Sequence, residues 1–158
     1  MSNKQSNTLR QQLIDATRGI NAHIDFDSAV QDFPVELRGA KPPGGPHSAW
    51  QLLEHMRIAQ WDILEFSRNP KHKSPPWPEG YWPATAAPPT KGAWDKSIRA
   101  FQEDARQLAD LIHDMEQDLL APFQHGDGQT LLREALLVAN HNSYHLGQLM
   151  FVKKMLLP

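Results

Sequence analysis

Cysteine is absent from this chain of 158 residues. Its absence excludes disulfide bonds, thiolate metal ligands and a cysteine nucleophile. Any nucleophile therefore has to come from another side chain, from a substrate or from water activated by a metal ion. A chain without cysteine is also compatible with a cytoplasmic location, which is the location we expect.

Long apolar runs and clusters of basic residues are missing as well. No apolar run approaches the roughly 18 residues that span a bilayer, and residues 1–12 are polar, so we expect no membrane partner. Sixteen Lys and Arg against 18 Asp and Glu give a formal net charge of −2, which argues against a nucleic-acid partner. With 40% hydrophobic residues, the chain is long enough for one core, which predicts a single domain over residues 1–158.

No segment alternates apolar and polar residues with the period of two that is typical of strands, whereas apolar residues recur at helical spacing. The pattern predicts four helices, over Leu9–Ala22, Ser48–Asn69, Trp94–Leu120 and Thr130–Leu156, and a short helical turn at 28–33. Thr8 is the expected N-cap of the first helix, and Ser48 with Gln51 forms a capping box at the start of the second. Seven prolines between residues 70 and 90 predict a rigid loop. Four helices in this order predict an all-α four-helix bundle.

Three histidines stand on the inward faces of these helices. His141 and His145 are four residues apart and therefore share one helical face, while His55 lies on the apolar stripe of its own helix. Two inward histidines alone could equally be hydrogen-bonded core residues or metal ligands. A third inward histidine favours the interpretation as metal ligands. Three neutral nitrogens leave a coordination position open, as in a catalytic divalent site. Zinc is the default for imidazole ligands, and nickel or iron also suit them.

Two familiar metal motifs are absent. A zinc-protease motif needs Glu directly after the first histidine of the pair, and Asn142 occupies that position. A di-iron bundle needs Glu-x-x-His on two helices, and no glutamate in the chain has a histidine three residues later.

Two segments resemble a known family. Residues 46–55, PHSAWQLLEH, and residues 141–149, HNSYHLGQL, are similar to the two signature regions of the DinB/YfiT-like superfamily of metalloenzymes. The resemblance implies a four-helix bundle whose metal ligands fall on His55, His141 and His145. Members with assigned activities transfer or isomerise groups with low-molecular-weight thiols, so the resemblance implies a thiol-dependent transferase, and it also suggests a homodimer.

From these observations we expect a metal-dependent transferase or hydrolase that activates a thiol or water for attack on a small molecule. The alternative is a non-catalytic bundle that binds a ligand or partner and holds a structural metal or none. A metal-bound water that exchanges with solvent would favour the enzyme, and a metal site sealed from solvent would favour the structural role.

Several further residues are candidates for roles beside the metal. They include His47 before the second helix, Asp62 seven residues after His55, and Tyr144 and Gln148 beside the histidine pair. Each could orient a ligand or substrate, and each has a plain structural alternative, such as helix capping or an exposed carboxylate. Trp77, Tyr81 and Trp82 could wall an apolar substrate pocket, or merely cap the bundle. The remaining histidines are expected to be surface or locally hydrogen-bonded residues: His23, His72, His113 and His125.

Overall fold

The computed structural model describes residues 3–20 and 22–157 and is built from helices. Four long helices, α1 (Asn3–Thr17), α3 (Ala49–Arg68), α4 (Ala93–His113) and α5 (Leu131–Leu156), are joined by the short α2 (Phe26–Val30) and two 3-10 turns, η1 (Val35–Leu37) and η2 (Glu79–Tyr81). The described residues contain no strand, only an isolated bridge between Pro122 and Thr130. The predicted all-α four-helix bundle is confirmed. None of the described helices is long and apolar enough to cross a membrane.

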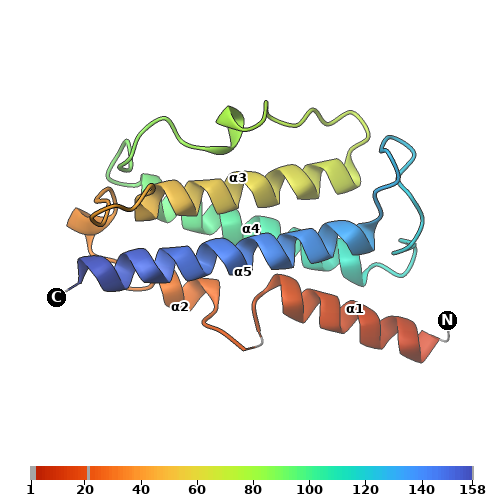
Figure 1. Cartoon of the computed structure of the whole chain (residues 1–158). Helices are drawn as coiled ribbons and strands as arrows, with labels where there is room; N and C mark the ends of the chain where they lie inside the picture. The colour runs from red at the N-terminus through yellow and green to blue at the C-terminus, as the bar shows by residue number, and fades with distance from the viewer. Residues whose placement is uncertain (1–2, 21, 158) are drawn as a thin grey trace.

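The helices form a bundle in which α1 and α3 occupy diagonal positions. Each of these two helices packs against both α4 and α5. The segment between α3 and α4 returns along the length of α3, so α3 and α4 run in the same direction while α1 and α5 run in the opposite one (Figure 1). This crossover segment, residues 69–92, lies over α3 and places η2 against that helix.

Local capping signals fix α3 and α5 where the sequence predicts them. The Ser48 side chain accepts a hydrogen bond from Gln51 N while the Gln51 side chain accepts one from Ser48 N, which completes the capping box. Thr130 caps α5 by accepting a hydrogen bond from Arg133 N. These caps set the register of the two helices that carry the three histidines.

The predicted bounds of the first helix are wrong. It begins at Asn3, and Thr8 lies inside it, where its hydroxyl donates to Lys4 O. It ends at Thr17, because Gly19 adopts a φ of +68° and Ile20 N donates back to Asp15 O. Only glycine takes this conformation without strain, and it closes the helix as a Schellman motif. Part of the predicted helix, residue 21, lies outside the described residues.

The predicted end of the third long helix at Leu120 is also wrong, because α4 ends at His113. The buried guanidinium of Arg10 on α1 donates to three carbonyls at that end: Ile112 O at 2.6 Å, Asp114 O at 3.0 Å and Gln117 O at 2.6 Å. Carbonyls at a helix end need such partners. A contact with α1 therefore stabilises the end of α4 at this point.

The core consists of two apolar clusters with a polar layer between them. The α2 cluster fills the end where α3 begins and includes Phe26, Trp50, Met56, Trp94, Phe101 and Leu146. The α1 cluster fills the opposite end and includes Leu13, Ile14, Leu64, Leu108, Ile112 and Val138. The polar layer between them consists of His55 and Gln60 on α3 and His141, Asn142 and His145 on α5.

Candidate metal centre

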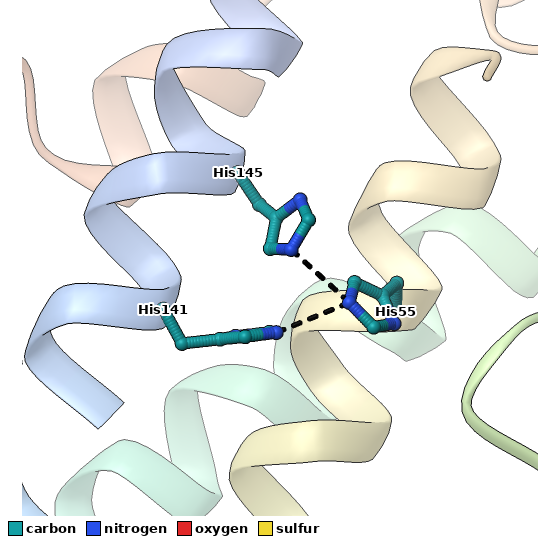
Figure 2. Close-up of side chains that lie close together, drawn as sticks. All are labelled: His55, His141 and His145. Carbon is teal, nitrogen blue, oxygen red and sulfur yellow. Dashed lines mark hydrogen bonds between the residues drawn. The ribbon is translucent and has the colours of Figure 1, made fainter. Parts of the chain in front are cut away.

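The three predicted ligand histidines converge between α3 and α5. Figure 2 shows His141 and His145 projecting from α5 toward His55 on α3. The Nε2 atoms of His141 and His145 each lie 3.1 Å from His55 Nε2. The three ligand atoms all lie within 4.8 Å of one another. A cation held by three imidazoles at a Zn–N distance of ~2.0–2.1 Å needs nitrogens about 3.3 Å apart, and the two separations of 3.1 Å are close to this value.

Hydrogen bonds on the far side of the rings show which nitrogen carries the proton. His55 Nδ1 lies 2.9 Å from Tyr81 O, and His145 Nδ1 lies 2.7 Å from Gln148 Oε1. Both oxygens can only accept, so each Nδ1 is the protonated nitrogen and each Nε2 presents a lone pair. Lone pairs that face one another at this distance repel unless a proton or cation lies between them. The donor set therefore suits a metal ion.

Burial keeps these imidazoles in the neutral form that binds metals. It lowers the pKa of His141 and of His145 to about 4, and the neighbouring histidines add a smaller lowering. Burial also lowers the pKa of His55, although the hydrogen bond to Tyr81 O opposes that shift. Protons therefore compete little for Nε2 near neutral pH.

One of the three predicted pocket aromatics lies directly on the cluster. Trp82 stacks on His55 with ring centroids 3.9 Å apart and planes within 1°, and His47 stacks on the other face of Trp82 at 4.1 Å. Trp77 is 73% exposed and packs edge-on against Tyr81 instead. The structure therefore places Trp82 and His47 beside the site and Trp77 outside it.

Asp62 is buried and acts on the loop that supports His55. It accepts hydrogen bonds from Tyr81 OH at 2.6 Å and His72 Nε2 at 2.7 Å. Burial and this carboxylate raise the pKa of Tyr81 to about 12. Because the same tyrosine offers its backbone oxygen to His55, Asp62 supports the position of His55 through Tyr81. His72, expected at the surface or in local bonds, is instead part of this largely buried network.

The two predicted neighbours on α5 lie differently. Gln148 contacts the cluster through its hydrogen bond to His145. Tyr144 is 63% exposed and touches His145 only with its ring, at a centroid distance of 4.9 Å.

Two residues of the polar layer are not singled out by the sequence patterns. Gln60 is 1% exposed and Asn142 is 9% exposed, and their side chains are hydrogen-bonded to each other at 2.8 Å. Asn142 Oδ1 lies 3.5 Å from His141 Nδ1. The sequence does carry a signal for this pair. Gln60 occupies an inward helical position between Met56 and Leu64, and a glutamine buried there needs a hydrogen-bond partner inside the core.

Fold and site together define a helical bundle with a three-histidine cluster able to hold a divalent metal ion. The family model of the DinB superfamily matches residues 22–149. The chain therefore belongs to the DinB superfamily, as the two signature segments indicated. No curated protein and no solved structure matches the chain.

Proposed function

We propose that this protein is a metal-dependent transferase or hydrolase that acts on a small molecule, with the metal held by His55, His141 and His145. The observation that carries the proposal is the convergence of three Nε2 atoms, two of them 3.1 Å from the third, on rings whose Nδ1 atoms face oxygens. Zinc is the first candidate for this ligand set, and nickel or iron also suit it.

The ligand set suits nucleophile activation. Three neutral ligands leave a divalent cation its full charge, and such a cation lowers the pKa of a coordinated thiol or water. The chain has no cysteine, so a thiol nucleophile has to come from a small thiol such as those used by the family. Trp82 is stacked between His55 and His47, so its edge and the outer face of His47 are the surfaces that could contact the apolar part of a substrate.

A non-catalytic role is the second candidate, because His55 is only 3% exposed and Trp82 covers its ring. A cation enclosed on every side would only hold α3 and α5 together. His141, however, is only partly buried, and a partly exposed ligand is compatible with exchange at the metal. We therefore place the enzyme first.

The test is elemental analysis of protein purified without an affinity tag. We expect about one equivalent of a divalent metal per chain in the wild type and none in His141→Ala. His113→Ala is the control, because His113 is exposed at the end of α4. Turnover of a small electrophile with and without added thiol then separates transferase from hydrolase. If no metal co-purifies and none binds with micromolar affinity, the proposal fails. Bound metal that never exchanges, without turnover, supports the structural role.

A further inference from the structure

The buried amides of Gln60 and Asn142 form a chain of hydrogen bonds that leads from α4 to the histidine cluster. Gln60 Nε2 donates to Phe101 O at 2.8 Å. A carbonyl oxygen can only accept, so the nitrogen of the Gln60 amide faces α4 and its oxygen faces α5. The orientation of this side chain is therefore set by the backbone of a neighbouring helix.

The same logic fixes Asn142. Its Nδ2 donates to Gln60 Oε1 at 2.8 Å, and that oxygen also can only accept. The other end of the Asn142 amide, Oδ1, then faces His141 Nδ1 at 3.5 Å. This contact is long for a hydrogen bond. The contact still decides which end of the amide the ring meets, because a reversed Asn142 amide would place its NH2 group against His141 Nδ1.

An acceptor beside Nδ1 favours the tautomer of His141 that carries its proton there. In the metal-free protein His55 Nε2, 3.1 Å from His141 Nε2, competes as the acceptor of a proton carried on His141 Nε2, so the Asn142 oxygen shifts a balance between two tautomers. In metal sites, groups that bind the outer nitrogen of a ligand histidine fix its tautomer and orientation in this way.

The three histidines differ in how firmly this tautomer is set. His55 faces a backbone carbonyl, which cannot turn over. His145 faces the amide of Gln148, whose nitrogen has no hydrogen-bond partner among the described residues and so does not prevent the amide from turning. For His141 the side-chain amide is held by a second amide and finally by Phe101 O.

We propose that Gln60 and Asn142 are positioning residues that shift His141 toward the Nδ1–H tautomer, whose Nε2 can bind the metal. This inference rests on the proposed function for its purpose. The tautomer itself is a property of the metal-free protein, and it can be tested whether or not the protein binds a metal.

The experiment is nitrogen-15 NMR of the imidazole rings in metal-free protein, followed by metal titration. In the wild type we expect a larger population of the Nδ1–H tautomer of His141 than in variants that disturb the two amides. Asn142→Leu removes the acceptor and Gln60→Met frees the asparagine amide to turn, so both should move the His141 proton toward Nε2. Asn142→Asp keeps an acceptor and should retain the wild-type tautomer. Metal affinity should fall about 10- to 100-fold in Asn142→Leu and Gln60→Met and stay within about tenfold in Asn142→Asp.

Matched controls separate positioning from general disturbance. Asn140→Leu changes an exposed amide on the same helix, and Gln102→Met changes an exposed glutamine on α4 that donates to Asp27. Neither should change the tautomer of His141 or the metal affinity. Gln60→Met carries the test if Asn142→Leu does not fold. An unchanged His141 tautomer in folded Gln60→Met would overturn the proposal. A shifted tautomer in a protein that binds no metal would support the amide chain and refute the metal-dependent function.

Discussion

The two apolar clusters and the polar layer between them are built on different principles. In the α1 and α2 clusters the side chains contribute by excluding water, which has no preferred direction. In the polar layer, each group depends on a partner at a defined position, such as Tyr81 O for His55 or Gln60 Oε1 for Asn142. Burying such groups costs free energy unless those partners are present. The middle of the bundle therefore depends on specific polar partners, and its ends depend on apolar packing.

Among substitutions that distinguish the apolar clusters from the polar layer, we expect the largest effect from one at Leu108, which is fully buried in the α1 cluster. Leu108→Ala leaves a cavity and should lower the free energy of unfolding by about 2–5 kcal/mol. The metal affinity of the folded protein should not change, because the substitution lies outside the polar layer. Urea unfolding of metal-free protein and metal titration below the unfolding transition measure the two quantities.

His145→Leu, in the polar layer, should have the opposite pattern, with a large loss of metal affinity and a small loss of stability. It removes one of three ligands and should lower metal affinity by more than about 100-fold, beyond the range for loss of an outer-shell partner. It also takes a partner from His55 and from Gln148, but His55 keeps its contact with His141 and Gln148 is partly exposed, so the free energy of unfolding of the metal-free protein should fall by only about 1 kcal/mol. A loss of stability as large as that of Leu108→Ala would show that the imidazoles hold the helices together by themselves.

This contrast also explains how much of the molecule the sequence predicts. Helices α3 and α5 are predicted because their signals are local: Ser48 with Gln51, and Thr130. The histidines are predicted because helical spacing places them on inward faces. The end of α4 is not predicted, because Arg10, which binds its carbonyls, lies about 100 residues earlier in the chain.

The supporting groups of the site divide in the same way. Gln148 lies near His145 along one helix, so spacing predicts its approach. The acceptor for His55 is the backbone oxygen of Tyr81, which has no signature in side-chain patterns. Gln60 meets Asn142 from another helix, and pairing across helices needs the tertiary structure.

A smaller effect is expected from pH in the metal-free protein. In the folded state burial lowers the pKa of His141 and His145 to about 4, from an ordinary value of 6.5. Between these values the unfolded chain binds more protons than the folded one, so the free energy of unfolding should fall as the pH falls. Each imidazole contributes at most about 1.4 kcal/mol per pH unit. Asp104 acts in the opposite sense in this range, because burial raises the pKa of its carboxyl to about 6, so the test uses an Asp104→Asn background. Because solvent reaches the rings in part, we expect a total loss of about 1–2 kcal/mol there between pH 6.5 and 5.

Urea unfolding at several pH values checks this expectation. In the same background His145→Leu should show a weaker pH dependence, because one of the rings with a lowered pKa is gone while His141 and His55 remain. Saturating metal should reduce the loss near pH 6.5, since protons then have to displace the ion. A stability profile that is flat from pH 6.5 to 5 in metal-free Asp104→Asn protein would contradict the buried, neutral state of the rings.

The smallest effect is expected at Tyr81, at the edge of the polar layer. Tyr81→Phe removes the hydrogen bond to Asp62 but keeps the backbone oxygen that binds His55. The free energy of unfolding should fall by about 1 kcal/mol and metal affinity by less than about tenfold, because the loop loosens while the ligand contact remains. Tyr144→Phe, on an exposed side chain, should change the free energy of unfolding by less than about 0.5 kcal/mol. If Tyr81→Phe lowered metal affinity more than 100-fold, the hydroxyl would act on the metal site directly, and support through the loop would be the wrong explanation.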